Sequence, residues 1–245
     1  MIEIKNLSKT FKIESNKKDQ TLFSHVKSIL ERKTKSRKLE VLKNISFNVQ
    51  EGEFLGIIGV NGSGKSTLLR ILGEIMQPDK GEIKIKGKIV PFLSLNMGFF
   101  ESLSAKENVL LNGVLMGIDK HFLLKNMDNI LEYTGLKGFR NVPLKKFSKG
   151  MNMRLVFGVA RYAQGDIYLV DEMLRVGDKN FREKCHEFFE GVRKKGKTIV
   201  YTTHNFNDIE KYCDRVVVLH KGKIVYDGDP KKAINFYEKI TEKRS

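Results

Sequence analysis

Residues 59–67 read Gly-Val-Asn-Gly-Ser-Gly-Lys-Ser-Thr, and this stretch decides the fold. It fits the pattern G-x-x-x-x-G-K-S/T, in which glycines let backbone N–H groups converge on phosphate oxygens. The apolar run 54–58 before it is typical of a buried strand, and residues 67–72 after it are typical of a helix start. Strand, glycine loop and helix N-terminus together predict a binding site for a nucleoside triphosphate.

Individual residues of this loop (59–67, which we call the P-loop) have separate expected roles. Lys65 is expected to reach the β- and γ-phosphates of the nucleotide, and the Ser66 hydroxyl is expected to bind Mg²⁺. The positive end of the following helix adds to the attraction for phosphate. The nucleotide-binding residues predicted here are Gly59, Asn61, Gly62, Ser63, Gly64, Lys65, Ser66 and Thr67.

The whole chain has 245 residues, enough for one α/β domain with an inserted part, and a formal net charge of +16. This charge fits nucleic acid, an anionic membrane surface, or a lysine-rich composition without a partner. Cys185 and Cys213 are far apart and predict neither a disulfide nor a metal site, as in a cytosolic protein. The chain start does not resemble a signal peptide, and no apolar run approaches the roughly 20 residues that span a bilayer. We therefore expect any membrane role to come through a partner or a surface contact.

Apolar strands alternate with helical stretches along most of the chain. The predicted strands cover 2–13, 41–50, 54–58, 82–86, 88–90, 167–170, 198–202, 216–219 and 223–226, and the best predicted helix covers 180–194. We expect an antiparallel hairpin leading from 41–50 into 54–58, and a second strand pair across Gly87. The continuously apolar strands indicate a mostly parallel sheet covered on both faces.

Two acidic residues end the apolar strand 167–170, as in a Walker B pattern. Asp171 is expected to hold the water shell of Mg²⁺ beside Ser66, and Glu172 to orient or deprotonate the attacking water. His204 follows another apolar strand, and ligands gather at this edge of open α/β sheets. We expect His204 to sense or polarise the γ-phosphate; a structural or solvated histidine is the alternative.

A serine and a glycine open a predicted helix in the run Phe147-Ser148-Lys149-Gly150-Met151. Free N–H groups at such a helix start bind anions. With the P-loop, this segment, the acidic strand and the histidine in this order, the chain resembles the ATP-binding subunits of ABC transporters over nearly its whole length. The resemblance implies an α/β fold: a P-loop, ABC-type ATPase domain with a mostly parallel core sheet, an antiparallel β subdomain and an inserted helical subdomain. It also implies ATP and Mg²⁺ as cofactors.

The same resemblance implies a homodimer in which two chains pair head to tail. Each ATP then lies between the P-loop of one chain and Ser148 and Gly150 of the other. Asp178, at the tip of residues 176–178, is placed to link the two sites. Phe11 stands where the family stacks an aromatic ring on adenine, although plain core packing explains this residue equally well.

Two departures from the usual family pattern point to a subgroup. Residues 148–151 read Ser-Lys-Gly-Met rather than Ser-Gly-Gly-Gln, and residues 91–107 contain no glutamine to meet Mg²⁺, so Asn96 is the nearest polar candidate. Together with Glu107-Asn108-Val109 and the run 171–178, these features are similar to exporters of lipid-linked O-antigen, capsule or teichoic acid. The resemblance implies a separate membrane permease docked over the helical subdomain and residues 96–102.

An insertion between the first two strands is also similar to this subgroup. Residues 22, 23, 26, 29 and 30 are apolar at helical spacing, and a basic run to Lys38 follows. This pattern predicts a cationic amphipathic helix within 21–38 that contacts an anionic lipid or the pyrophosphate of a lipid-linked glycan. The alternative is a helix whose apolar face packs on its own domain.

We therefore expect an ABC ATPase domain over 1–230, with the basic insertion at 14–40 and the helical subdomain at about 97–163. A short C-terminal helix and tail over 231–245 follow, without the glycan-reading domain of some longer members. The predicted function is an ATPase subunit that powers export of a lipid-linked polysaccharide, held peripherally at the cytoplasmic face of the membrane. One alternative is an ABC subunit for another transported substrate. The other is a soluble ABC ATPase acting on nucleic acid or ribosomes, which typically needs paired ATPase halves or a long coiled coil.

Overall fold

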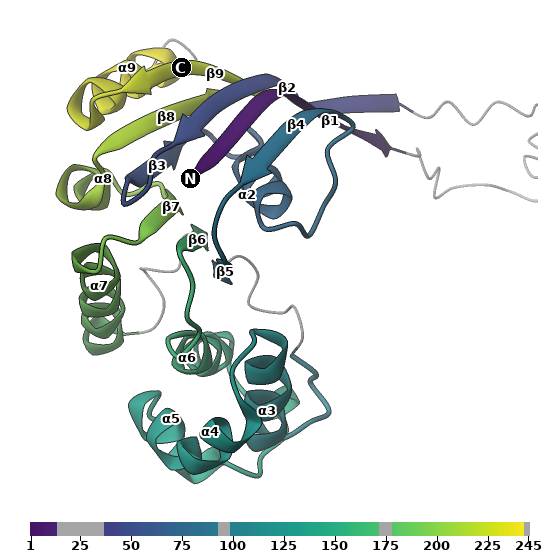
Figure 1. Cartoon of the computed structure of the whole chain (residues 1–245), viewed down its shortest axis with the longest axis vertical. Helices are drawn as coiled ribbons and strands as arrows, with labels where there is room; N and C mark the ends of the chain where they lie inside the picture. Colours follow the sequence, from purple (N-terminus) through teal and green to yellow (C-terminus); the bar gives the residue numbers. More distant parts are fainter. Residues whose placement is uncertain (14–36, 93–98, 172–177, 243–245) are drawn as a thin grey trace, which may run out of the picture.

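The protein is built on two β-sheets packed beside each other (Figure 1). The computed structural model describes residues 1–13, 37–92, 99–171 and 178–242. Within these ranges, an antiparallel sheet has the order β2-β1-β4, and a six-stranded sheet has the order β5-β6-β7-β3-β8-β9. The second sheet is parallel except for β9. The strands are β1 Ile2–Ile13, β2 Arg37–Val49, β3 Phe54–Ile58, β4 Lys80–Ile85, β5 Ile89–Phe92, β6 Ile167–Asp171, β7 Thr198–Thr202, β8 Arg215–His220 and β9 Lys223–Gly228.

The helices fall into two groups in space. Figure 1 shows α3 to α6 gathered at one end of the molecule, away from α2 and the antiparallel sheet. α9 packs against α8 and the strand pair β8–β9. The helices are α2 Lys65–Leu72, α3 Ala105–Leu115, α4 Lys120–Lys125, α5 Met127–Tyr133, α6 Lys149–Ala160, α7 Lys179–Lys194, α8 Phe206–Tyr212 and α9 Pro230–Glu242, with short 3₁₀ turns at Lys137–Phe139 and Leu144–Lys146. None of the helices in the described ranges combines the length and the hydropathy that crossing a bilayer requires.

The central strands of the six-stranded sheet, β6, β7, β3 and β8, are buried on both faces. In β3, Phe54 and Ile58 belong to a core shared with helices α3 to α9, which we call the helix-side core. Leu55 and Ile57 belong to a second core shared with α2 and the antiparallel sheet, which we call the P-loop-side core. β6 and β7 alternate between the two cores in the same way. This double burial explains why the parallel strands read as continuous apolar runs.

Phe157 of α6 is the centre of the helix-side core and is fully buried. Its ring centroid lies 5.5 Å from that of Phe188, 5.6 Å from Phe181, 5.9 Å from Phe92, 6.1 Å from Phe189 and 6.4 Å from Tyr133. These partners come from β5, α5 and α7. The Tyr133 pair is stacked, and the other pairs are tilted or edge-to-face. Because aromatic rings favour these geometries at such separations, the cluster holds α6 in a defined orientation on the sheet.

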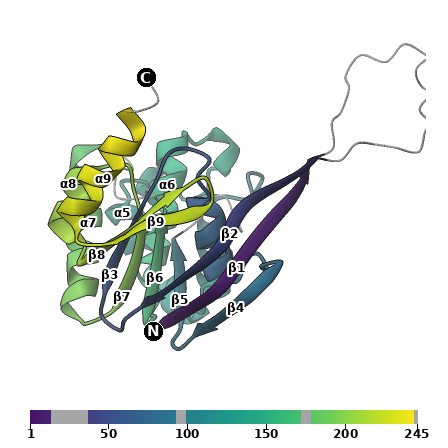
Figure 2. The same cartoon turned by 90° about the horizontal axis from the view of Figure 1, so that it is seen from above.

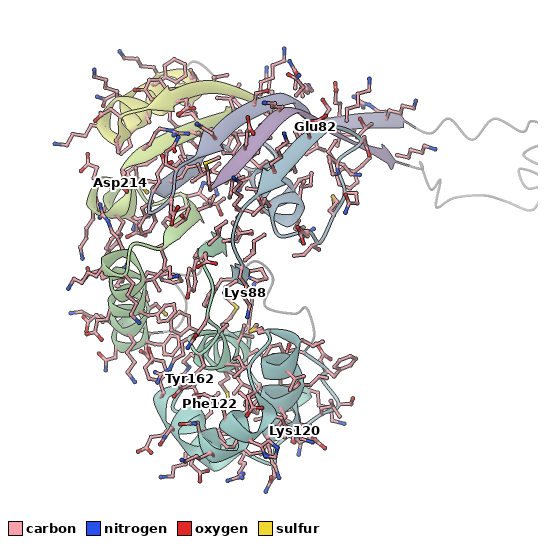
Figure 3. All side chains as sticks on the ribbon, in the orientation of Figure 1. Glu82, Lys88, Lys120, Phe122, Tyr162 and Asp214 are labelled. Atoms are coloured by element: carbon pink, nitrogen blue, oxygen red, sulfur yellow. The ribbon has the colours of Figure 1, made fainter. Side chains whose placement is uncertain are left out.

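The helices at this end of the molecule are also joined by aromatic contacts near its surface. Phe122 of α4 and Tyr162, just beyond α6, lie side by side in Figure 3, with ring centroids 5.3 Å apart. The Arg161 guanidinium stands 3.7 Å from the centroid of the Tyr133 ring. Such a close cation–π contact joins the end of α6 to α5.

The segment before α3 is fixed by Asn108. Ser104 and Glu107 form a capping box, in which the Ser104 side chain accepts from Glu107 N–H and the Glu107 carboxylate accepts from Ser104 N–H. The buried Asn108 side chain accepts from Phe100 N–H at 2.8 Å and donates to the Phe100 and Leu103 carbonyls, each at 3.0 Å. The Glu107-Asn108 pair thus anchors the start of the helical group.

Most predicted strands are confirmed, but both predicted hairpins are wrong. β2 pairs with β1, and the turn 51–53 carries the chain from the antiparallel sheet to β3 in the other sheet. Likewise, β4 pairs with β1, whereas β5 lies parallel to β6. Neighbouring strands were expected to pair because short connections favour hairpins. Here each short connection crosses from one sheet to the other instead.

β1 and β2 continue as a two-stranded ribbon to one corner of the molecule (Figures 1 and 2). Pairing continues through Lys12 with Lys38 to Ile13 with Arg37. The predicted insertion therefore ends earlier than expected, because residues 37–40, including basic Arg37 and Lys38, belong to strand β2. The rest of the insertion, 14–36, lies outside the described residues.

Candidate active site

The P-loop follows β3 at the carboxyl edge of the six-stranded sheet and leads directly into α2. Gly62 and Gly64 adopt left-handed conformations, with φ of 77° and 111°. A Cβ on Gly59 would stand 2.2 Å from the Leu219 carbonyl oxygen of β8. Glycine is therefore required at 62 and 64 for the turn and at 59 for the close approach of β8.

Lys65 is the first residue of α2, and its side chain folds back over the loop. Its Nζ donates to the Gly59 carbonyl at 2.6 Å and to the Val60 carbonyl at 3.3 Å. The residue is only 7% exposed. Its positive charge is thus held inside the curve of the loop, where the N-terminus of α2 also attracts anions.

A pocket of about 280 Å³ opens over this loop. His204, which follows β7 and is exposed, lines it together with the loop. The described lining residues are Leu39, Val41, Asn61, Gly62, Ser63, Gly64, Lys65, Ser66, Thr67 and His204. The structure therefore brings His204 to the P-loop, as the sequence predicts, and the lining of backbone amides and a cation suits a phosphate chain.

Leu39 and Val41 of β2 were missed by sequence reasoning. Leu39 is 45% exposed although it is apolar, and it pairs across the ribbon with Phe11. Phe11 itself is half-buried, with Lys9 Nζ 5.9 Å from its ring centroid, and is not among the described residues that line the pocket. The ribbon thus supplies an apolar wall beside the phosphate loop. No local sequence pattern marked Leu39, because its position opposite Phe11 follows from the pairing of β2 with β1.

Asp171 ends β6, and α2 packs against this strand. The half-buried Asp171 carboxylate accepts through Oδ1 from the Thr202 hydroxyl of β7. Ser66 is exposed on the first turn of α2 and lines the pocket. A hydroxyl and a carboxylate are hard oxygen ligands of the kind Mg²⁺ prefers, so the chemistry of Ser66 and Asp171 suits this ion. Asp171 is not among the described residues that line the pocket, and its role as a magnesium ligand stays a prediction.

No group of three His, Cys, Asp or Glu side chains among the described residues is arranged to hold a metal ion. A magnesium ion at Ser66 and Asp171 would complete its shell with water and phosphate oxygens. Mg²⁺ typically binds in this way, with one or two carboxylates and several retained waters.

The neighbouring Tyr201 fixes the end of β7. It is fully buried, and its hydroxyl donates to Asp208 Oδ2 of α8 at 3.1 Å. Burial raises the pKa of the Tyr201 hydroxyl, so it stays protonated and keeps donating at any physiological pH. The strand that carries Thr202 and precedes His204 is thereby tied to α8.

The predicted second anion site lies at the start of α6. Ser148 is the N-cap residue of α6, and its hydroxyl accepts from Met151 N–H at 3.2 Å. A Cβ on Gly150 would find only Ser148 Oγ, at 3.9 Å, so this helix start faces open space. Neither residue is among the described lining of the P-loop pocket, and Figure 1 shows α6 and α2 well apart. Within one chain the two halves of the predicted site do not meet.

Asp178 caps α7 by accepting from Phe181 N–H at 2.9 Å. Its Oδ2 also lies 3.8 Å from Nη1 of Arg154, which is on α6. The tip of the predicted linking loop is thus connected to the helix that begins at Ser148. Glu172, Asn96, Val176 and Gly177 lie outside the described residues, so their predicted roles remain predictions.

Comparison with known proteins shows which family and which proteins this chain is similar to. The sequence profile of the ABC transporter family matches residues 42–175. The O-antigen export system ATP-binding protein RfbB of Klebsiella pneumoniae is 36% identical, and the match covers 83% of each chain. The teichoic acids export ATP-binding protein TagH of Listeria innocua is 32% identical over 98% of this chain and 70% of its own length.

Two further comparisons concern length and structure. The ABC transporter protein AbcA of Aeromonas salmonicida is 35% identical over 82% of this chain, which spans 65% of the AbcA length. Among solved structures, a dimeric post-hydrolysis state of the ATP-binding cassette MJ0796, with ADP and Pi bound, is similar with a TM-score of 0.73. It is 25% identical, and the match covers 94% of this chain and 99% of that one. The fold class predicted from the sequence, and the resemblance to this group of ATPases, are confirmed.

Proposed function

The chain belongs to the ABC transporter family, and from this membership we propose that it binds and hydrolyses ATP to power export of a lipid-linked polysaccharide. The P-loop pocket with His204 on its wall carries the ATPase part of the proposal. The polysaccharide part rests on the similarity to RfbB and TagH, which are named for O-antigen and teichoic acid export.

In the proposed reaction, the loop amides and Lys65 bind the β- and γ-phosphates of ATP and stabilise charge that develops as the terminal P–O bond breaks. Ser66 and Asp171 would hold Mg²⁺, which neutralises phosphate charge when bound. His204 lines the pocket, and we expect its side chain to contact the γ-phosphate of bound ATP. Glu172 accepts the proton of the attacking water, or orients that water.

We propose that two chains form the complete site. Exposed Ser148 and half-buried Gly150 lie at the start of α6, and neither is among the described residues that line the pocket over their own P-loop. A second chain is needed to bring such an anion-binding helix start to the γ-phosphate. The dimer of the similar cassette MJ0796 supports this arrangement. ATP binding would close the dimer, and hydrolysis would reopen it.

The proposed complex also contains a membrane permease, which would hold the ATPase at the cytoplasmic face of the membrane. The permease is expected to dock over the helical group α3 to α6. Within that group Leu115 is 68% exposed and Phe122 is 40% exposed, which suits a contact surface. Affinity purification from detergent-solubilised native membranes, followed by mass spectrometry, tests this. Recovery of a multi-span permease encoded among glycan-synthesis genes is expected; recovery of only ribosomal or DNA-associated proteins would contradict the transport function.

The ATPase part has its own test. Glu172→Gln should leave ATP binding intact and lower turnover by roughly two to four orders of magnitude, because the general base is lost. Turnover near that of the wild type would place the base elsewhere.

The basic insertion is the proposed contact with the anionic lipid or with the pyrophosphate of the lipid-linked glycan. The described end of the ribbon supports this, because Lys12, Arg37 and Lys38 are exposed there. Reversing the charge of Lys33, Lys35, Arg37 and Lys38 should reduce export and spare basal ATP hydrolysis. Unchanged export would refute the contact.

A further inference from the structure

We propose that Thr202 is a positioning residue for the metal site: its hydroxyl holds one oxygen of Asp171 so that the other faces the Mg²⁺ of bound nucleotide. This inference rests on the proposed ATPase function and adds a residue to its site. The hydroxyl is one residue beyond the apolar part of β7 and two residues before His204.

The sheet register brings the two side chains together. Asp171 pairs with Thr202 at the ends of the parallel strands β6 and β7. Thr202 is fully buried, and its Oγ1 donates to Asp171 Oδ1. A buried hydroxyl normally needs a hydrogen-bond partner, and a carboxylate is a strong acceptor. This bond therefore satisfies both the Thr202 hydroxyl and the Asp171 carboxylate.

The bond restricts the Asp171 carboxylate. With Oδ1 held by Thr202, rotation about the Cβ–Cγ bond is opposed, and Oδ2 is the oxygen that remains for a metal or its water. Hydrogen bonds to ligating carboxylates typically orient the ligand and raise metal affinity. Thr202 also pairs with Ile57 of β3, two residues before Gly59. The same residue therefore connects the metal-binding strand to the strand that leads into the P-loop.

Two other threonines, Thr203 and Thr198, bond to backbone groups and not to Asp171, so the contact with the Asp171 carboxylate is specific to Thr202 among these three residues. The Thr203 hydroxyl accepts from Asn205 N–H at 3.0 Å and shapes the turn into α8. Thr198, at the other end of β7, accepts from Gly52 N–H at 3.0 Å and is equally buried, at 1% exposure. Thr198 thus offers a matched control: its hydroxyl is as buried and as well bonded, but it lies far from Asp171 along the strand.

The competing explanation is that Thr202 only fills the core, with its hydroxyl satisfied by the nearest acceptor. Thr202→Val separates the two, because valine keeps the branched shape and removes the hydroxyl. Thr202→Ser keeps the hydroxyl and removes a methyl group. If Thr202 positions Asp171, Thr202→Val should weaken metal binding and Thr202→Ser should preserve it. If Thr202 only fills the core, Thr202→Ser should be the more harmful substitution.

The experiment measures Mn²⁺ binding by electron paramagnetic resonance, with the intact chain and a non-hydrolysable ATP analogue. Thr202→Val should weaken Mn²⁺ affinity by about tenfold. Thr202→Ser and Thr198→Val should bind as the wild type does. The affinity for the analogue in the absence of metal, measured by calorimetry, should be the same in all variants and in the wild type. If Thr202→Val folds poorly, Thr202→Ala compared with Thr202→Ser carries the same test, because these two variants differ only by the hydroxyl.

The outcomes separate this inference from the function beneath it. Failure of the wild type to bind the analogue would overturn the proposed ATPase. Normal binding by the wild type with equal Mn²⁺ affinity in Thr202→Val would overturn the role of Thr202 alone. An equal loss in Thr198→Val would assign the effect to strand stability and also refute the positioning role.

Discussion

Gly158→Ala sets two physical effects against each other at the contact between α6 and α5. Gly158 is buried inside α6, where alanine is intrinsically better by about 1 kcal/mol. An added Cβ, however, would stand 2.3 Å from Cγ2 of Thr134. Thr134 cannot move aside easily, because it is 1% exposed and its hydroxyl donates to the Ile130 and Leu131 carbonyls at 3.1 and 3.0 Å.

The clash should therefore decide the sign. Overpacking of a filled core costs about 1–3 kcal/mol, and a contact this short belongs near the upper end. After subtracting the helix-propensity gain, we expect Gly158→Ala to lower the free energy of unfolding by about 1–2 kcal/mol. In a chain of this size that corresponds to a melting temperature lower by roughly 2–8 °C.

Urea unfolding followed by circular dichroism measures this change, and Gly191→Ala is the control. Gly191 lies in α7 with no atom within 4 Å of its added Cβ, so the same substitution should stabilise by up to about 1 kcal/mol. Thr134→Ser removes the opposing methyl and keeps the hydroxyl, so it should recover most of the Gly158→Ala loss in a double-mutant cycle. Equal stabilisation by Gly158→Ala and Gly191→Ala would refute the reasoning.

Four further predictions concern the site and the core. Gly150→Ala should leave stability within about 1 kcal/mol of the wild type, since its Cβ meets open space, yet lower ATPase turnover about a hundredfold by blocking the close approach of a phosphate to the helix. Arg154→Gln should change stability by less than about 1 kcal/mol, because its ion pair with Asp178 is partly exposed, but weaken ATP-dependent dimerisation in analytical ultracentrifugation. Burial raises the pKa of Cys185 to about 12, so mass spectrometry should detect no iodoacetamide adduct there at pH 8 until urea unfolds the chain. Because the unfolded thiol ionises first, Cys185 should also make stability fall as the pH rises above about 8.5.

The parts of the site that could be predicted from the sequence are those marked by a short, local sequence pattern. The P-loop, Asp171 and His204 each adjoin an apolar strand, and parallel strands deliver their carboxyl ends to one edge of the sheet. The structure accordingly places His204 and the P-loop around one pocket and packs α2 against the strand that ends at Asp171.

The parts that sequence reasoning missed depend on pairing between distant strands. The bond from Thr202 to Asp171 follows from the register of β6 and β7, which no local pattern specifies. Leu39 enters the pocket wall because β2 pairs with β1 along the whole ribbon. The two wrong hairpins have the same origin, because their short connections resemble tight turns but lead from one sheet to the other.

The division of the six-stranded sheet between two cores has an evolutionary consequence. Neighbours in sequence, such as Phe54 and Leu55 or Tyr168 and Leu169, face different sets of packing partners. Substitutions in separate cores, with no shared contacts, act nearly independently, whereas substitutions within one core are coupled. Compensating changes in related chains should therefore link Leu55 with residues of α2 and the antiparallel sheet rather than with Phe54. Along these strands, covariation should link residues two positions apart, which share a face, rather than adjacent residues. The face that packs against α2 and the face that packs against α6 can then diverge at different rates.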